Sequence, residues 1–321
     1  MILTDTIWAV IKLLAGFVLL FFGGDWLVDG GVALARKYRI SSLVIGMTIV
    51  AFGTSAPELL VSMISAIKGS AGIAMGNVLG SNIANIGLIL GVTALLCPIP
   101  TDNRKVLKNG LIMIAASVLL LAFSLNGGIS RIEGLVLFAG IVLFAGIVLF
   151  TTLSILKGRT AETDIEIQGK NMSVFVAILL IILSCFMLAF GADFMVDGAT
   201  VLAKSMGVSD KVIGLTIVAL GTSLPELAAS VAAAIKKEMD ISIGNIIGSN
   251  IFNILCVLGV SGSIRPITFE YAQYSVDFII MLAFAVALVL YVQPWKLQGR
   301  LGRMAGITLF LAYIAYAWSL F

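Results

Sequence analysis

Apolar runs long enough to cross a lipid bilayer follow one another along this 321-residue chain. A transmembrane helix needs about 20 mostly apolar residues. The hydropathy pattern predicts ten such spans, at residues 7–35, 42–67, 72–96, 106–125, 132–156, 173–203, 210–235, 241–263, 272–292 and 303–320. The first has no cleavage-site pattern, so we expect a true span and not a signal peptide. Membrane β-barrels need segments of about ten residues with alternating polarity. Such segments are missing from the sequence, which therefore predicts an all-α membrane protein.

Composition supports a chain surrounded by lipid. Hydrophobic residues make up 60% of the sequence and charged residues 12%, whereas a soluble domain carries about 25% charged residues. The chain contains no histidine, which removes the commonest proton relay and transition-metal ligand. Cys97, Cys185 and Cys256 occur singly in apolar stretches, a pattern that favours free thiols. The net charge of +3 is spread over the loops, so no nucleic-acid partner is expected.

The basic residues predict how the chain is oriented. If the N-terminus lies outside, the loops that face the cytoplasm carry 14 of the 20 basic residues: Arg36, Lys37, Arg39, Arg104, Lys105, Lys108, Lys157, Arg159, Lys170, Lys236, Lys237, Lys296, Arg300 and Arg303. Lysine and arginine collect in cytoplasmic loops. We therefore expect a multi-pass protein of the plasma membrane, of the bacterial inner-membrane type, with both termini outside.

An internal repeat organises the chain into two halves. Residues 44–91 and 212–259 align without a gap at an offset of 168, with 28 of 48 positions identical, and the offset also matches 23–30 to 191–198. Five predicted spans separate the copies. Because five is odd, the copies enter the membrane from opposite sides, as in inverted-repeat transporters. We predict two inverted five-helix repeats, at 1–156 and 173–321, joined by a short cytoplasmic linker at 157–172.

A Gly-Thr-Ser-x-Pro-Glu motif lies in the middle of a span in both halves, at residues 53–58 and 221–226. Proline lacks an N–H and clashes with the carbonyl four residues earlier, which frees the carbonyls of Gly53 and Gly221. The residue before proline is also biased away from the α region. The helix should therefore break and restart with proline near its first position. Within a membrane, such a break survives only where it is buried in protein or lines a cavity.

Glu58 and Glu226 bring negative charge to these breaks. A carboxylate at the bilayer centre costs ~3 kcal/mol on insertion scales. No lysine or arginine lies at a comparable depth in the sequence, so protons or bound cations must neutralise the pair. Two carboxylates with several carbonyls and hydroxyls form an oxygen-only ligand set that suits Na⁺ or Ca²⁺. The alternative is that both glutamates stay protonated and only hold helices together.

A second polar motif, Gly-Asn-x-x-Gly-Ser-Asn-Ile-x-Asn, also occurs in both halves, at 76–85 and 244–253. Ser81 and Asn85 are four residues apart and share a helix face. The two glycines of each copy form a small-xxx-small pair that lets another helix approach closely. Interhelical packing and hydrogen bonding explain part of this motif equally well. Asn82 and Asn250 therefore receive no role of their own.

Five aspartates are open to more than one interpretation. Asp25, Asp29, Asp193 and Asp197 lie late in the long first and sixth spans. A position near the membrane interface explains them as well as a place in the ion pathway. Asp277 has no equivalent in the other half and receives no assignment.

At these paired motifs the sequence resembles the cation/Ca²⁺ antiporter superfamily, and within it the prokaryotic Na⁺/Ca²⁺ exchangers. The resemblance covers the whole chain. It implies two inverted five-helix halves, four ion sites in a diamond at the midplane, and first and sixth helices that slide to alternate access. It implies no resident cofactor, because Ca²⁺ and Na⁺ bind as substrates.

The resemblance also implies a role for each motif residue. Glu58 and Glu226 bridge the central sites. The other implied ligands are the carbonyls of Thr54, Thr222, Ala51 and Ala219, the hydroxyls of Ser55, Ser223, Ser81 and Ser249, and the central amides of Asn85 and Asn253. Several exchangers carry aspartate where this chain has Asn253, which puts the coupling stoichiometry, proton involvement and any K⁺ requirement in doubt.

Other functions remain open alongside Na⁺/Ca²⁺ exchange. An H⁺/Ca²⁺ or a K⁺-dependent Na⁺/Ca²⁺ antiporter would use the same oxygen ligands. A passive cation channel usually gains its acidic ring from oligomeric symmetry, whereas here the symmetry lies within one chain. An intramembrane hydrolase would need a nucleophile and base that the motifs lack, so no enzyme activity is expected. The oligomeric state is open.

Overall fold

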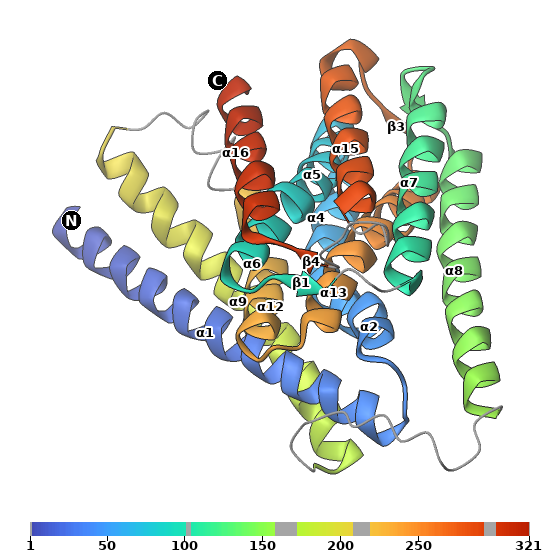
Figure 1. Ribbon diagram of the computed structural model, residues 1–321. Coiled ribbons are helices and arrows are strands. Elements are labelled where there is room, and N and C mark those ends of the chain that lie inside the picture. The colour runs from blue at the N-terminus through green and yellow to red at the C-terminus, as the bar shows by residue number, and fades with distance from the viewer. Residues whose placement is uncertain (1, 101–103, 158–171, 208–218, 292–299, 321) are drawn as a thin grey trace.

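A computed structural model describes residues 2–100, 104–157, 172–207, 219–291 and 300–320 as a bundle of helices (Figure 1). The first half contains α1 (Ile2–Lys37), α2 (Ser42–Ile45), the π-helical segment η1 (Gly46–Val50), α3 (Ala51–Thr54), α4 (Ala56–Lys68), α5 (Ala71–Ala84), the π-helical segment η2 (Asn85–Leu90), α6 (Gly91–Leu96), β1 (Ile99–Pro100), α7 (Arg104–Ser124), β2 (Gly128–Ile129) and α8 (Arg131–Lys157). The second half contains α9 (Val174–Ser205), α11 (Ala219–Gly221), α12 (Leu224–Ile235), α13 (Met239–Phe252), the π-helical segment η4 (Asn253–Leu258), α14 (Gly259–Ile264), β3 (Ile267–Thr268), α15 (Tyr271–Tyr291), β4 (Arg300–Leu301) and α16 (Arg303–Ser319). Almost all of the predicted linker lies outside the described residues.

Most of the ten predicted spans are visible as long apolar helices. Seven described helices are long and apolar enough to cross a membrane, and the bent pair Ser42–Thr54 and Ala56–Lys68 makes an eighth. The predicted span 303–320 corresponds to α16, an apolar helix of 17 residues. The predicted span 210–235 falls partly outside the described residues, and α12 forms its described end. The all-α membrane fold is confirmed.

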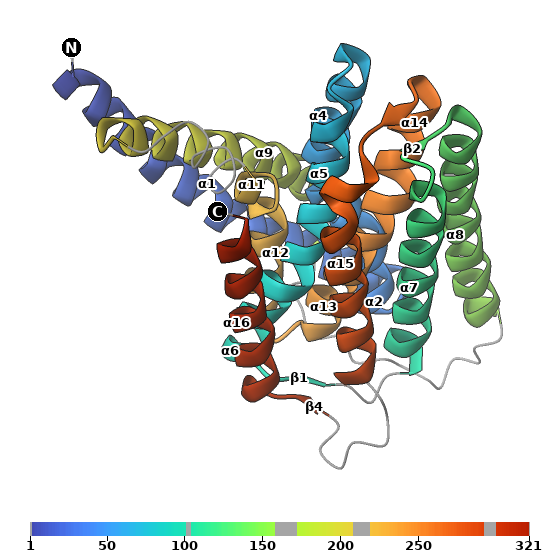
Figure 2. The ribbon, with the colours of Figure 1, turned by 90° about the horizontal axis from the view of Figure 1, so that it is seen from above.

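The longest helices, α1 and α9, run obliquely to the rest of the bundle. They contain 36 and 32 residues, which at 1.5 Å per residue makes each about 50 Å long, well above the ~30 Å of a bilayer core. They lie against each other along much of their length (Figure 1, Figure 2). A Cβ atom on Gly16 would lie 2.7 Å from the Gly191 carbonyl oxygen, so the two backbones touch. The predicted tilt of these spans is confirmed.

Two short strand pairs tie the halves together. β1 pairs antiparallel with β4, and β2 pairs antiparallel with β3, so each pair takes one strand from each half. The 21-residue helix α7 separates β1 from β2, which puts the two pairs at opposite ends of the bundle (Figure 2). The equivalent strands β1 and β3, which are 168 residues apart, therefore lie on opposite sides. This placement agrees with two inverted repeats.

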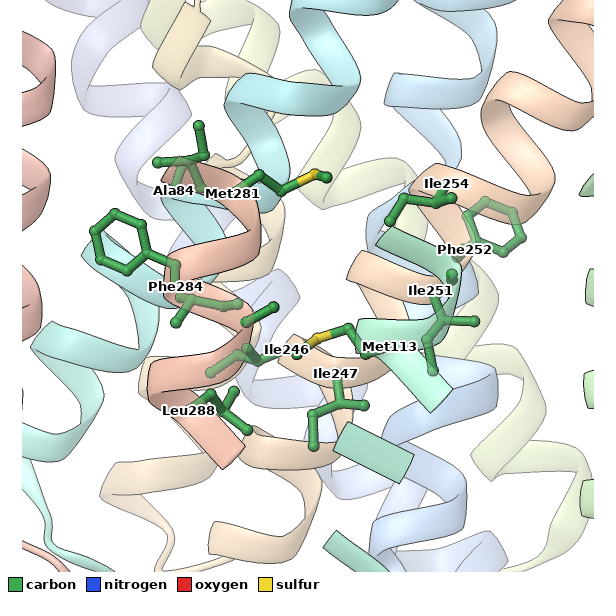
Figure 3. Packing of buried hydrophobic residues seen from close by; sticks show 14 of the residues in the cluster. Ala84, Met113, Ile246, Ile247, Ile251, Phe252, Ile254, Met281, Phe284 and Leu288 are labelled. Carbon is green, nitrogen blue, oxygen red and sulfur yellow. The ribbon is translucent and has the colours of Figure 1, made fainter. Parts of the chain in front are cut away.

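The helix α13 forms the centre of the core. Ile246, Ile247 and Ile251 on α13 pack between Met113 of α7 and Met281 of α15 (Figure 3). All of its residues from Ile241 to Phe252 are buried. Because buried polar groups are costly unless they are paired, the polar residues of this helix must find partners inside the protein.

Three glycines let α13 touch the π-helical segment η1. A Cβ atom on Gly248 would lie 2.6 Å from the Met47 carbonyl oxygen, and one on Gly244 would lie 2.6 Å from that of Leu43. On the facing side, a Cβ atom on Gly46 would lie 2.5 Å from the Ile241 carbonyl oxygen. The predicted close approach at a small-xxx-small pair is therefore confirmed for the second copy of the motif.

Two turns carry basic residues in a left-handed backbone conformation. Arg39 has φ 53°, whereas its equivalent in the other half is Gly207 with φ 80°. Likewise Lys237 has φ 62° and its equivalent Gly69 has φ 83°. This conformation costs a residue with a Cβ atom about 1–2 kcal/mol. Both basic residues belong to the loops of the basic-rich face, so their side chains are kept there despite the backbone cost.

Candidate functional site

The predicted helix breaks fall on Ser55 and Ser223. These residues have φ −88° with ψ 8° and 1°, respectively, and the helices α4 and α12 begin directly after them. The two parts of the first broken helix meet at 46°. A break with proline near the restart is confirmed. The prediction that the residue before proline leaves the helix is wrong, because Ala56 and Leu224 already start the new helices. Proline is accepted there since the first N–H groups of a helix have no intrahelical partner.

Glu58 and Glu226, one from each half, come together beside these breaks. Both side chains are fully buried, and they are close enough for their charges to repel each other. The Ser55 hydroxyl donates to Glu226 Oε1 at 2.7 Å, and its oxygen lies 3.0 Å from Ser249 Oγ. Among the described residues, neither glutamate forms an ion pair with a basic side chain. The site therefore combines two buried carboxyl groups with hydroxyls from both halves.

Several buried oxygen atoms of the two motifs have no hydrogen-bond partner within the described part of the chain. They are Glu58 Oε1 and Oε2, Glu226 Oε2, Ser81 Oγ, Ser223 Oγ, Asn85 Oδ1 and Asn253 Oδ1. Leaving such an atom unpaired costs about 1–3 kcal/mol. The same described residues hold no cluster of three or more His, Cys, Asp or Glu side chains, which a transition-metal site would use. Oxygen atoms of this kind are the ligands that hard cations prefer.

An asparagine holds each broken helix in place. The amide of Asn245 donates to the Glu226 backbone carbonyl at 3.4 Å and to Ser230 Oγ at 3.0 Å, while the Thr54 hydroxyl donates to Asn245 Oδ1 at 3.2 Å. Four equivalent residues repeat these contacts with Asn77 at the centre: Asn77, Glu58, Ser62 and Thr222. Each asparagine therefore links the restarted helix of its own half to the break of the other half.

A second asparagine network orients the central amides. Asn253 Nδ2 donates to Asn82 Oδ1 at 3.2 Å, and Asn82 Nδ2 donates to Met281 Sδ at 3.7 Å. The equivalent contacts use Asn85, Asn250 and Met113. Since the amide nitrogens of Asn85 and Asn253 are engaged, their carbonyl oxygens are left to face other groups. Asn82 and Asn250, which the sequence left without a role, position the two central amides.

The remaining predicted ligands differ in how well the geometry suits them. Ala51 is buried, but its carbonyl already accepts the Ser55 N–H at 3.0 Å and the Thr54 hydroxyl at 3.3 Å. Its role as a ligand therefore rests on the resemblance alone. Thr222 is partly buried, and its hydroxyl is used by the asparagine scaffold. Ala219 is the first residue of α11.

Sequence reasoning missed the scaffold around the glutamates. It gave no site role to the asparagines Asn77 and Asn245 or to their serine partners Ser62 and Ser230. A signal was present, because each of these residues is identical in the two halves at the offset of 168. Identity between inverted halves at polar, buried positions is thus a sharper criterion than the motif alone.

The aspartates of the long helices form ion pairs. Lys236, just after α12, contacts Asp25 Oδ1 at 2.8 Å and Asp29 Oδ1 at 2.5 Å. Lys12 pairs with Asp197, and Asp193 is exposed. These contacts favour the interfacial interpretation over the ion pathway. Asp277 accepts a hydrogen bond from the Tyr316 hydroxyl at 2.7 Å and so joins α15 to α16.

Replacing Asn245 by leucine is expected to weaken Ca²⁺ binding about tenfold. The change leaves the Thr54 hydroxyl, Ser230 Oγ and the Glu226 carbonyl without their partner, at about 1–3 kcal/mol for each buried group, and it loosens the break that presents Glu226. Calorimetric titration of purified protein with Ca²⁺ measures the effect. Asn126→Leu, in the connection after α7, is the control, and equal affinities of the two variants would contradict the scaffold role.

Comparisons with known proteins agree with this geometry. A family model described as sodium/calcium exchanger protein matches residues 8–153 and 176–321. The putative antiporter CaxA of Alkalimonas amylolytica is 40% identical, over 98% of this chain and 98% of its own. The sodium/calcium exchanger MaX1 of Methanosarcina acetivorans is 35% identical, over 96% of this chain and 97% of its own.

The structure is also similar to a solved exchanger. The sodium–calcium exchanger NCX_Mj, soaked with 10 mM Na⁺ and no Ca²⁺, matches with a TM-score of 0.83 and 35% identity, over 98% of this chain and 100% of the other. The family model covers both halves, so the likeness does not rest on one motif. The chain belongs to the sodium/calcium exchanger family.

Proposed function

We propose that this membrane antiporter exchanges Ca²⁺ for Na⁺ by alternating access, with both ions bound between Glu58 and Glu226. The observation that carries the proposal is the set of unpaired buried oxygen atoms on the two motifs, which includes both oxygens of Glu58. The twofold arrangement of this set supports a site that can be reached in turn from either side. The name of the relative MaX1, a sodium/calcium exchanger, supports the same ion pair.

Charge balance explains why such a site would exchange ions. Without cations, two carboxylates would carry their negative charge through a closed intermediate of low dielectric constant, where repulsion is strong. One Ca²⁺ balances two carboxylates, and so does a set of Na⁺ ions. Loading with either ion removes the barrier, so that each passage across the membrane requires bound ions. Neutral Asn253 adds no charge to this balance.

The driving gradient tests the proposal directly. In proteoliposomes loaded with Na⁺, an outward Na⁺ gradient is expected to drive uptake of radioactive Ca²⁺, while an outward K⁺ gradient or a pH gradient alone is not. Uptake driven by the pH gradient alone would show an H⁺/Ca²⁺ antiporter. Uptake that needs K⁺ together with Na⁺ would show a K⁺-dependent exchanger. Either result would overturn the ion pair proposed here.

A passive cation channel predicts a different flux pattern. In an exchanger, Ca²⁺ or Na⁺ on the far side accelerates the flux of labelled Ca²⁺, because the loaded site returns faster than the empty one. A pore shows no such trans-stimulation. Absence of trans-stimulation at saturating Ca²⁺ would contradict alternating access.

We also infer the orientation of the two halves. Residues 1–156 and 173–321 form the repeats, residues 157–172 link them on the cytoplasmic side, and both termini lie outside a plasma membrane of the bacterial inner-membrane type. The bias of basic residues supports this orientation. A cysteine placed at Gly207, which follows α9, should react with a membrane-impermeant thiol reagent added outside intact cells. Labelling only after the cells are opened would reverse the orientation.

A further inference from the structure

A cavity at the basic-rich end of the bundle has a positively charged rim. It encloses about 250 Å³ where the turn before α2, the first turns of α7 and the last turns of α8 meet. Arg39, Ser41, Lys108 and Asn109 line its polar part. None of the described residues that line it is acidic. The rim therefore attracts an anion.

The inner wall of this cavity leads into a second cavity that is apolar. Met47 and Phe144 line both cavities, so the two spaces adjoin. The second cavity encloses about 530 Å³ and continues between α8 and α9, where Phe52, Ile181 and Phe186 face it. A free phosphate ion would fill only the first cavity. A molecule that suits both must have an anionic head and a long apolar tail.

The backbone at the rim gives independent support. Arg39 keeps its side chain in a left-handed turn, where the equivalent residue of the other half is Gly207. A residue held in such a conformation is a reason to look for a function of its side chain. Arg39 already makes one interaction within the protein, but a guanidinium group has five N–H donors. It can therefore keep that interaction and still bind a phosphate.

We propose that these cavities bind an anionic phospholipid, with its phosphate between Arg39 and Lys108 and an acyl chain along Met47 and Phe144. Arginine and lysine at the membrane surface are each worth enough to select anionic over zwitterionic headgroups. The tail would contact Ile181 and Phe186 of α9, which is one of the two long oblique helices. The bound lipid would therefore affect how fast the exchanger changes conformation as well as whether the lipid stays bound.

Lipid binding can be tested without reference to transport. Purified protein is reconstituted with phosphatidylglycerol and phosphatidylcholine, and the bound lipid is quantified by native mass spectrometry. The double variant Arg39→Gly/Lys108→Gln should bind phosphatidylglycerol about 30-fold more weakly, from the loss of two basic contacts. Glycine suits the left-handed turn, as Gly207 shows in the other half, so folding should be preserved, and the melting temperature checks this.

The control variant is Lys237→Gly. It removes a basic residue from another left-handed turn of the same face but does not line the cavities. Phosphatidylglycerol binding should match that of the wild type. Equal losses in the control and the double variant would show general surface attraction and overturn the site, as would wild-type binding by the double variant.

Transport and free phosphate provide the second measurement. Addition of phosphatidylglycerol to phosphatidylcholine vesicles should raise the exchange rate of the wild type and of Lys237→Gly, but not of the double variant. Inorganic phosphate added to pure phosphatidylcholine vesicles should have no effect. If inorganic phosphate displaces the lipid or replaces its effect, the ligand is a free anion and the phospholipid proposal is wrong.

Discussion

Glu58→Gln protein is expected to lose Na⁺-driven Ca²⁺ uptake almost completely. Both oxygens of Glu58 lack a partner among the described residues, so the carboxylate is available to a cation. Removing one member of a buried, paired set of charges costs about 3–5 kcal/mol, which corresponds to a loss of roughly several-hundred-fold or more in affinity. Uptake of radioactive Ca²⁺ into proteoliposomes and Ca²⁺ titration by calorimetry measure the two effects.

The control for this variant is Glu133→Gln at the start of α8. Glu133 is exposed and accepts hydrogen bonds from Ser130, a capping arrangement in which glutamine serves as well as glutamate. This variant should transport like the wild type. Unchanged uptake in Glu58→Gln would remove Glu58 from the site and, with it, the proposed charge balance.

Gly248→Ala should be the most destabilising single-methyl change in the core. The added Cβ atom would lie 2.6 Å from the Met47 carbonyl oxygen and 2.7 Å from its Cα atom, and a backbone cannot move aside as a flexible side chain can. Overpacking of this kind costs about 1–3 kcal/mol, which should lower the melting temperature of the purified protein by roughly 3–10 °C.

The matched control is Gly146→Ala in α8. Gly146 is exposed, and no described atom lies within 4 Å of the position of its Cβ atom. Alanine favours a helix over glycine by about 0.5–1 kcal/mol, so the melting temperature should stay level or rise slightly. Melting of Gly248→Ala within a degree of the control would contradict the backbone contact between α13 and η1.

The meeting of the two glutamates could be predicted from the sequence because it depends on counting. An odd number of spans between identical motifs inverts one copy, and the prolines identify where each helix breaks. The position of the break was missed by one residue. Local bias disfavours a helical residue before proline, but Ser55 and Ser223 take the non-helical conformation instead.

The contacts that support the site could not be predicted in this way. Thr54 contacts Asn245, and Thr222 contacts Asn77, across 191 and 145 residues of sequence. No periodicity records a side-chain contact between two helices so far apart. The same holds for Lys236, whose pairing with Asp25 and Asp29 depends on how α1 lies against α12.

The strand pairs at the two ends of the bundle restrict the kind of motion that transport can use. Because β1–β4 and β2–β3 each join one half to the other, the halves are clasped at both membrane surfaces. Rocking one half against the other as a rigid body would break a clasp at every turnover. The two halves therefore act mechanically as one frame. The conformational work of exchange falls on the oblique pair α1 and α9, which moves within that frame.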